Sequence, residues 1–470
     1  MDYLTLIPPL IALAVAVWTR NVFWALGLAI LSSETLQAAW NPFYGALQGL
    51  ERGVAVFSNA GNTRIILFCL LVGALIAFMR RSGGIAAMVD FLQRRSFAST
   101  PRRAGLTTAG AGIAIFLETN ISLLSTGLIG RFLFDELNLS RERLAYIIDS
   151  TCAPICILVL LNGWGFFILE LMSNNGVEAP VSVLVWTIPF NFYPLLTLVV
   201  VFLTLISNRT FGPLDIADRR TSVRLEAPAA GQSDHAMDSR GSVAPSQSEV
   251  PSRLIYMAGP MATLIGGTLI FMVWTGDGNI LNGSGSKSIL WSVALATLLA
   301  LAGLVMSGRA PGQLLVTGFD GMKNLIPAVT VIFLAFLLGN SLSALGTGAY
   351  ISSLAQSISL PWLIPAVMFL IAAVTSFTTG TSWGTYAILV PIAVPLSLGA
   401  GVPVPLAMAA IMGGGVFGDH CSPISDTTII ASLAAGCDHF DHVRTQLPYA
   451  LSVGLLSMIA YLVAGYLMTP

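Results

Sequence analysis

Charged residues are scarce in this chain of 470 residues. Asp, Glu, Lys and Arg together make up 10% of the sequence, whereas hydrophobic residues make up 55%. Because about a quarter of the residues of a typical soluble domain are charged, this composition excludes a soluble globular protein. It predicts an all-α polytopic membrane protein, in contact with membrane lipid, whose spans each need about 20 apolar residues. The formal net charge of −1 gives no reason to expect a nucleic-acid partner.

Cysteine is also rare, and a cleavable leader is missing from the pattern. The five cysteines are an odd number and most lie in apolar or motif segments, so no disulfide framework is expected. The first 20 residues have no basic segment ahead of their apolar run. We therefore expect them to form a first membrane span rather than a signal peptide.

Apolar runs fill most of the chain and predict about ten to twelve crossings. Two long runs, 104–134 and 361–398, are interrupted by Gly, Ser and Thr and are candidates for re-entrant hairpins. One stretch, 208–253, is polar and rich in Ser, Ala and Pro, which predicts a disordered linker. It separates two transmembrane repeats, 1–207 and 254–470. Arginines between positions 80 and 103 predict that this segment is cytoplasmic. The linker is long and balanced in charge, and we expect it to be cytoplasmic as well.

Three pairs of segments occur in the same order in both halves and indicate an internal duplication. RSGGIAAMVDFL (81–92) is similar in pattern to GTGAYISSLAQSI (346–358). A polar cluster follows in each half: Glu118, Thr119 and Asn120 in the first, Thr379, Gly380, Thr381 and Ser382 in the second. The third pair is CAPIC (152–156) and CSPIS (421–425), which begin 33 residues after Thr119 and 40 residues after Thr381.

The segment GGGVFGDHCSPISDTTIIAS (413–432) places acids, hydroxyls and a proline inside an apolar region. An acid at the centre of a membrane helix costs at least about 2.5–3.5 kcal/mol, so such acids usually line an ion or substrate path. Pro423 predicts a broken helix, with freed carbonyls and a helix N-terminus beside the acids. We expect an ion- or substrate-binding site here, with Na⁺ at Asp419, Ser422 and Asp426. The predicted residues are Asp419, His420, Ser422, Pro423, Ser425, Asp426 and Thr427.

Each predicted site residue also has a simpler explanation. Residues 413–428 would form a polar loop if they lay outside the membrane, and the tips at 118–120 and 379–382 would be interfacial turns. In the first half we expect the matching core at Asp149, Ser150, Thr151 and Pro154, although Ser150 or Thr151 would equally suit an N-cap. The run CDHFDHVRT (437–445) is interpreted as a solvated loop. Trp164 and Trp383 are assigned to an interfacial belt, with the alternative that Trp383 lines a pocket.

The stretch GDHCSPISDTTIIASLAAGCDHFDHVRTQLPYAL (418–451) closely resembles the signature of the NhaC family of Na⁺/H⁺ antiporters. RERLAYIIDSTCAP (141–154) and TSFTTGTSWGTYAILVPIAVPL (375–396) resemble further segments of that family. The resemblance implies two inverted repeats with broken helices and re-entrant hairpins, a scaffold and a transport domain, and elevator-like movement. It also implies that the second-half core includes Thr428. Glu118-Thr119 stands where many similar sequences have paired aspartates, which affects the expected number of coupling ions.

The leading hypothesis is therefore a secondary transporter of the inner membrane that exchanges Na⁺ for protons, with no cofactor and with no enzymatic activity. The alternative is a Na⁺- or H⁺-coupled carrier of a small organic carboxylate or amino acid, bound at helix N-termini near Ser150 and Ser422. A passive channel and an intramembrane hydrolase are weaker alternatives, since adjacent helical residues such as His420 and Cys421 point about 100° apart. A homodimer is expected from the resemblance alone.

Overall fold

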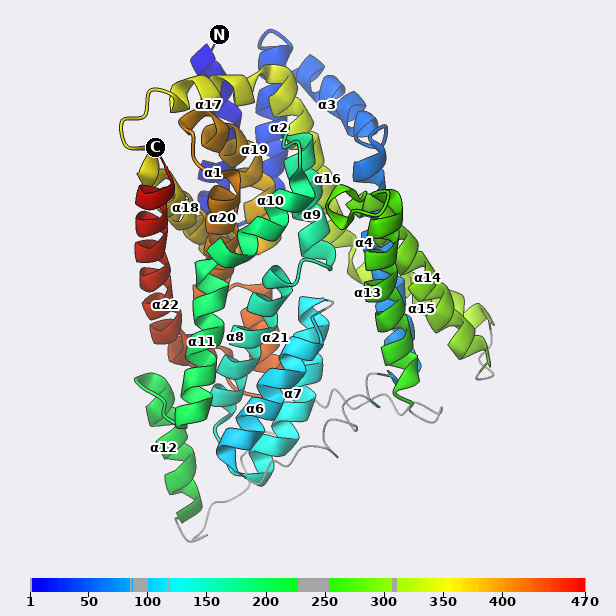
Figure 1. Ribbon diagram of the computed structural model, residues 1–470, viewed down its shortest axis with the longest axis vertical. Helices are drawn as coiled ribbons and strands as arrows, with labels where there is room; N and C mark the ends of the chain where they lie inside the picture. Colours follow the sequence, from blue (N-terminus) through cyan, green and yellow to red (C-terminus); the bar gives the residue numbers. More distant parts are fainter. Residues whose placement is uncertain are drawn as a thin grey trace.

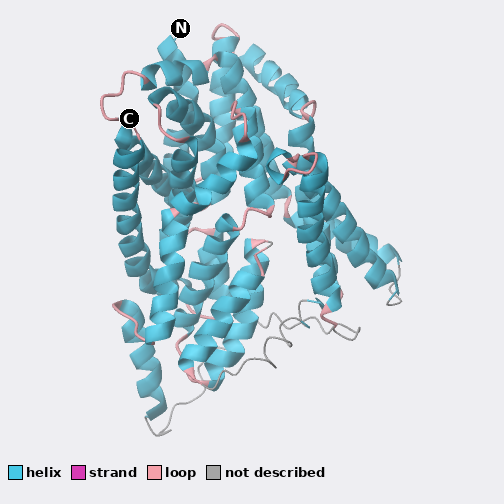
Figure 2. Ribbon diagram, in the orientation of Figure 1, coloured by secondary structure: helices cyan, strands magenta, loops and turns pink. Residues whose placement is uncertain are grey.

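The structure is a computed structural model that describes residues 2–84, 87, 100–116, 118–226, 253–306 and 311–469. Within these ranges the regular structure is helical and contains no strand (Figures 1 and 2). The α-helices are α1 (Ile7–Thr19), α2 (Val22–Gln37), α3 (Pro42–Val56), α4 (Ala60–Arg81), α6 (Pro101–Ala114), α7 (Thr119–Glu136), α8 (Arg141–Leu158), α9 (Gly163–Asn174), α10 (Pro180–Thr187), α11 (Phe192–Ser207), α12 (Pro213–Glu226), α13 (Ile255–Thr275), α14 (Gly285–Met306), α15 (Pro311–Asn324), α16 (Ile326–Leu345), α17 (Thr347–Ala355), α18 (Ile364–Thr379), α19 (Ser382–Ala400), α20 (Val404–Cys421), α21 (Asp426–Ala435) and α22 (His439–Met468). Short 3-10 helices are η1 (Asp2–Leu6), η2 (Ile188–Phe190), η3 (Ile280–Asn282) and η4 (Pro361–Leu363).

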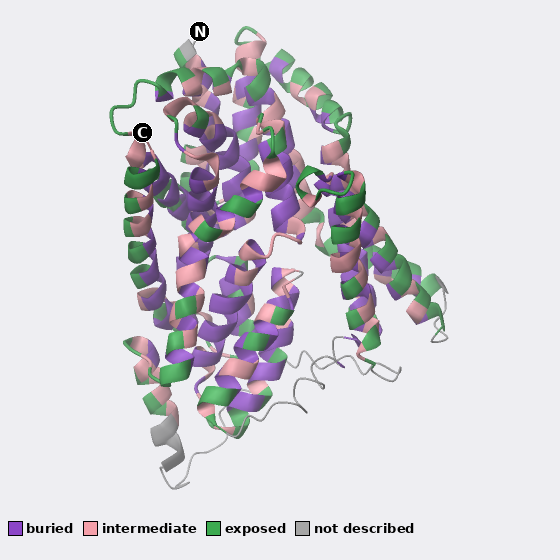
Figure 3. Ribbon diagram, viewed as in Figure 1, coloured by how far each residue is buried: buried purple, intermediate pink, exposed green. Residues whose placement is uncertain are grey.

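The outer faces of the helices are apolar, as membrane helices require. Large apolar side chains are exposed on α3, α14 and α22, among them Phe43, Leu298 and Leu455 (Figure 3). Of the described helices, seven are long and apolar enough to cross a membrane, or up to ten if each of three bent pairs is one span. The protein is thus a multi-pass membrane protein. Its crossings reach the lower end of the predicted ten to twelve only when the bent pairs are included.

Four consecutive helices of the first half recur in the second half at a constant spacing. The first residues of α6, α7, α8 and α9 are each followed 263 positions later by the first residues of α18, α19, α20 and α21, for example 404 minus 141. The predicted duplication is therefore present. The predicted alignment of CAPIC with CSPIS as equivalent repeat segments is wrong. Cys152 and Cys421 are 269 positions apart, and at the repeat spacing of 263 the equivalent of Cys421 is Leu158.

The two repeats are inverted relative to each other. In Figure 1 the hairpin α6–α7 and helix α8 lie in the lower part of the molecule, whereas the hairpin α18–α19 and helix α20 lie in the upper part. Helices α9 and α21 then continue to the opposite side, so both breaks and both hairpin turns lie near mid-height. This arrangement brings one end of each of the eight helices α6–α9 and α18–α21 to the same level.

The helices form two groups that meet at this level. The scaffold group consists of α2, α3, α4 and α13–α16, in which α4 packs against α14, α15 and α16. The hairpin group consists of α6, α7, α8 and α18–α22 with α11, in which α18 packs against α20, and α21 against α7 and α8. The groups touch where α16 meets α19, and α9 lies between them, in contact with α4 and α16 of the scaffold group and with α19 of the hairpin group.

The predicted linker is partly helical, contrary to the expectation that it is disordered. Residues 213–226 form α12, and residues 227–252 of the predicted linker lie outside the described residues. Pro213 suits the first turn of this helix. Asp218 accepts hydrogen bonds from the hydroxyls of Ser140 and Thr210 and lies 3.6 Å from Arg143. These contacts fix α12 to the hairpin group and explain why a polar segment is ordered.

Candidate functional site

The break between α20 and α21 is formed by Ser422–Ser425, as Pro423 predicts. The carbonyls of Asp419, His420 and Pro423 accept hydrogen bonds, so the expectation of free carbonyls around Asp419 and His420 is wrong. The carbonyl of Pro423 lies 2.7 Å from Nε2 of His439, and the carbonyl of Asp419 accepts a hydrogen bond from Thr428. Polar side chains of neighbouring segments thus satisfy the break. Oxygen ligands for a cation must then come mainly from carboxylates and hydroxyls.

Asp419 is buried and surrounded by hydroxyl groups from three segments. Its carboxylate accepts hydrogen bonds from Ser382 at the start of α19, from Ser376 on α18 at 3.3 Å, and from Ser425 in the break at 3.3 Å. Ser425 is in turn 3.0 Å from the hydroxyl of Thr427. Carboxylate and hydroxyl oxygens are hard ligands of the kind that alkali and alkaline-earth cations prefer. Asp419 is therefore the centre of a nest of carboxylate and hydroxyl oxygens.

The turn of the second hairpin rests directly on this break. Gly380 has a φ of +66°, and a Cβ atom placed on it would lie 2.5 Å from the carbonyl oxygen of Ile424. Ser422 anchors the other side, because its hydroxyl donates to the carbonyl of Phe377 at 2.7 Å. The hydroxyl of Thr379 donates within its own helix to Thr375. The hairpin tip and the break consequently form one unit around Asp419.

A cavity of about 360 Å³ lies between the scaffold group and the two hairpin tips. Glu118, at the tip of the first hairpin, and Asp426, at the start of α21, both line it. Glu118 is the N-cap of α7 and accepts hydrogen bonds from two backbone amides of that helix. Acids from the two repeats thus face one space, together with Asn120, Thr379 and Thr381.

The scaffold side of the cavity adds polar groups that sequence reasoning missed. Arg20 and Asn21 between α1 and α2, and Asn324 at the end of α15, line it. A single Arg or Asn at a helix end carries no distinctive pattern, so only the tertiary structure, which brings these helix ends to the cavity, identifies these residues.

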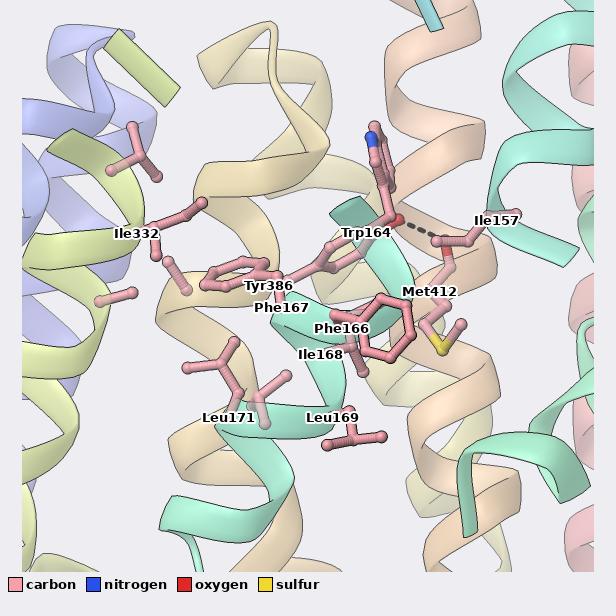
Figure 4. Close-up of a cluster of buried hydrophobic side chains, with 14 of the residues drawn as sticks. Ile157, Trp164, Phe166, Phe167, Ile168, Leu169, Leu171, Ile332, Tyr386 and Met412 are labelled. Carbon is pink, nitrogen blue, oxygen red and sulfur yellow. Dashed lines mark hydrogen bonds between the residues drawn. The ribbon is translucent and has the colours of Figure 1, made fainter. Parts of the chain in front are cut away.

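Two tryptophans close the cavity from the side of α9 and α19. Trp164 and Trp383 line it with their ring centroids 5.3 Å apart, and Trp164 also packs against Tyr386 (Figure 4). The hydroxyl of Tyr386 donates to the carbonyl of Met412, which ties α19 to α20 (Figure 4). Trp164 is buried, so its assignment to an interfacial belt is wrong, whereas the pocket alternative for Trp383 is confirmed.

The first-half core differs from the prediction, because Asp149, Ser150, Thr151 and Pro154 lie inside one continuous helix, α8. Thr151 donates to the carbonyl of Ile147 within that helix, and Pro154 is tolerated there without a break.

The true break of the first half, 159–162, ends at Asn162, whose side chain caps α9 by accepting from Trp164 and Gly165. Asn162 also donates to the carbonyls of Phe116 and Cys156, and so joins the break to the first hairpin tip. Thr119, at that tip, is buried and its hydroxyl has no partner among the described residues.

Asp149 belongs to a second buried cluster rather than to the cavity. Gln446 on α22 donates to Asp149 at 2.6 Å, and Nε2 of His442 lies 3.5 Å from the same carboxylate oxygen. His420 points to this side as well, with its Nδ1 3.0 Å from the hydroxyl of Tyr193. His442 is fully buried. The prediction of a solvated loop at 437–445 is therefore wrong for the residues from His439 onward, which begin α22.

The predicted site residues thus separate into two groups. Asp419 is hydrogen-bonded to Ser382 and Ser425, which are next in sequence to the cavity-lining residues Trp383 and Asp426. Asp149 and His420 belong instead to the second cluster, with Gln446. Inverted repeats, broken helices and buried acids at mid-height are the features of a secondary transporter. The fold is shared with the YdaH transporter of Alcanivorax borkumensis, with a TM-score of 0.58 at 14% identity over 91% of this chain and 90% of that one.

Sequence comparison places the chain more narrowly. Residues 155–466 match the model of the Na⁺/H⁺ antiporter family, and the chain belongs to this family. It is 30% identical to an uncharacterized protein of Haemophilus influenzae over 98% of this chain and 91% of that protein. Over shorter stretches it is similar to the arginine/ornithine antiporter ArcD of Halobacterium salinarum, with 35% identity over 38% of this chain and 36% of that protein. It is also similar to the Na⁺/H⁺ antiporter NhaC of Alkalihalophilus pseudofirmus, with 29% identity over 31% of this chain and 32% of that protein.

Proposed function

We propose that this antiporter exchanges Na⁺ for protons and that Asp419 binds the cation. The observation that carries the proposal is the buried carboxylate with hydroxyls of Ser376, Ser382 and Ser425 around it. Asp426 and Glu118 line the cavity in front of this nest and would attract a cation into it. Ser422, a predicted ligand, holds the break in place through Phe377.

The position of the cavity supports alternating access. It lies where the scaffold group meets the hairpin tips, so a displacement of the hairpin group against the scaffold would carry Asp419 from one side to the other. This is the elevator-like movement that the family resemblance implies. We further propose that the protein works in the inner membrane, and that it does so as a homodimer.

The test is cation-driven proton flux in liposomes that contain the purified protein and a trapped pH dye. Na⁺, Li⁺ and K⁺ are added separately. We expect Na⁺ to move protons through the wild-type protein, and Asp419→Asn to abolish this flux because the neutral amide cannot balance the charge of the bound cation. The exposed acid Asp441, at the start of α22, provides the control Asp441→Asn, which should retain the flux. Wild-type rates in a folded Asp419→Asn protein would exclude Asp419 as the cation ligand.

One observation favours a second candidate, the coupled transport of a small organic ion. The cavity is of the size of a small-molecule site, roughly 300–1,000 Å³, and exceeds what a bare cation needs. Arg20 could pair with a carboxylate there, while Asp426 and Glu118 suit an ammonium group. In the same liposomes, a panel of organic acids and amino acids distinguishes the two. Proton flux that appears only after an organic solute is added would favour this candidate over Na⁺/H⁺ exchange.

A further inference from the structure

The cluster around Asp149 has an unusual amount of unused hydrogen-bonding capacity. Asp149 and His442 are fully buried and Gln446 is 1% exposed. Among the described residues, Oδ1 of Asp149, both ring nitrogens of His442 and Oε1 of Gln446 have no hydrogen-bond partner. A buried polar atom without a partner destabilises a fold. Several such atoms around one carboxylate are more than packing of α8 against α22 requires.

The cluster is separate from the cavity and unique to one repeat. Asp149, His442 and Gln446 do not line the cavity, and no hydrogen bond or ion pair between described residues joins Asp149 or His442 to Asp419. At the repeat spacing of 263 residues, the position equivalent to Asp149 is Met412, and the position equivalent to Asp419 is Cys156. Each buried acid therefore exists in one repeat only. An exchanger of two different ions has a use for two acids that are not equivalent.

We propose that the Asp149–His442 pair, oriented by Gln446, is the proton-binding site of the exchanger, distinct from the cation site at Asp419. The inference rests on the proposed Na⁺/H⁺ exchange. The pair takes up one proton from one side of the membrane and releases it to the other. The proton is held between Oδ2 of Asp149 and Nε2 of His442, which are 3.5 Å apart, so only O–H and N–H bonds form and break.

Gln446 provides a physical link between the two sites. The same Nε2 group that donates to Asp149 also lies 3.1 Å from the carbonyl oxygen of His420, the residue next to Asp419. When the charge of Asp149 changes, the strength of its hydrogen bond to Gln446 changes too. That change reaches the end of α20, where Asp419 binds the cation, and gives a route for coupling.

The other titratable groups near the pair come from every neighbouring element. His420 is contributed by α20, Tyr193 by α11, and Tyr146 and Cys152 by α8 itself. Asp419 and Asp426 act on Asp149 electrostatically from the cavity side. His439, also on α22, is directed to the carbonyl of Pro423 instead. Because Asp149 and Asp419 interact electrostatically, a cation bound at Asp419 would favour loss of the proton from the pair, as exchange requires.

The experiment compares two fluxes of one protein in liposomes. Na⁺-driven proton flux reports coupled exchange, and radioactive Na⁺ counterflow at equal Na⁺ and constant pH on both sides reports cation binding and alternating access alone. We expect Asp149→Asn to lower the proton flux at least 10-fold and to retain the counterflow within about 2-fold. Asp419→Asn should lose both. Ser457→Ala, a buried hydroxyl on α22 that bonds only within its helix, is the matched control and should retain both.

Two results would overturn the proposal. Proton flux of Asp149→Asn that equals the wild type shows that the proton binds elsewhere. Loss of both fluxes in a monodisperse Asp149→Asn protein places Asp149 in the cation site or in the folding core. If the wild-type protein itself shows no Na⁺-driven proton flux, the proposed function fails, independently of Asp149.

A second variant keeps the test decisive if Asp149→Asn does not fold. His442→Gln preserves a polar side chain of similar length but removes the imidazole ring. We expect its exchange to persist with the pH of half-maximal rate displaced by about one unit, the range over which neighbouring charges act on buried groups. An unchanged pH profile would exclude His442 from the proton site.

Discussion

At the scale of single residues, the site depends on a glycine as much as on its acids. Gly380 turns the second hairpin with a φ of +66°, and the carbonyl oxygen of Ile424 occupies the space where a side chain would begin. This contact places Ser382 against Asp419 and positions the hydroxyl nest. The sequence showed the Gly and Thr at this tip but gave no sign of what the glycine faces.

Gly380→Ala should destabilise the protein and impair transport. The left-handed conformation costs a non-glycine residue about 1–2 kcal/mol, and the contact with Ile424 adds to this. Thermal unfolding in detergent and Na⁺-driven proton flux are the measurements. Gly266→Ala on α13 is the control, because nothing lies within 4 Å of a Cβ there and alanine favours a helix. A Gly380→Ala protein as stable and active as the control would show that the tip does not need this close contact.

At the scale of elements, the two breaks are held by different chemistry. The second break ends at Ser425, next to Asp426, and its proline makes it visible in the sequence. The first break has no proline, and it is held by the side chain of Asn162. Because the sequence matched Pro154 to Pro423, it gave no sign of the break at 159–162. A proline within a helix that is packed on all sides is compatible with continuity, and local pattern alone does not distinguish the two cases.

Asn162→Ala should lower the free energy of unfolding by about 1–2 kcal/mol, the usual value of an N-cap, and should reduce transport. Its bonds to the carbonyls of Phe116 and Cys156 join the break to the first hairpin tip. The comparison is Asn41→Ala, which removes the N-cap of α3 at an exposed position. If both variants lose similar stability but only Asn162→Ala loses transport, the first break takes part in exchange. Equal transport in both would mean that the first break has no part in exchange.

At the scale of the whole molecule, the cavity exists only because two groups of helices meet there. Val22 on α2 belongs to the scaffold group, and Gly384 on α19 to the hairpin group. A Cβ on Gly384 would lie 2.9 Å from the Cβ of Val22. The two Cβ atoms of a disulfide are about 3.5–4.5 Å apart, so this separation is a little shorter. The two positions therefore report whether the groups move past each other.

In a background without the five native cysteines, oxidation of Val22→Cys/Gly384→Cys should stop transport, and a reductant should restore it. The physical reason is that a bond across the interface prevents displacement of the hairpin group. The measurement is proton flux before and after reduction, with each single-cysteine variant as the control. Full transport by the cross-linked protein would rule out relative motion of α2 and α19 as part of the cycle.

The sequence by itself determined the membrane class, the internal duplication, the hairpin tips and the second break. These follow from local causes: apolar length, a proline, and clusters of small and hydroxyl residues in the same order in both halves. Only the tertiary structure decided which polar groups meet. It separated Asp149 from Asp419 although both were predicted for one site. It brought His442, from an expected loop, and Gln446 to Asp149, and it placed Arg20 and Asn324 on the cavity. Contacts between segments hundreds of residues apart depend on how whole helices pack, and no local pattern encodes them.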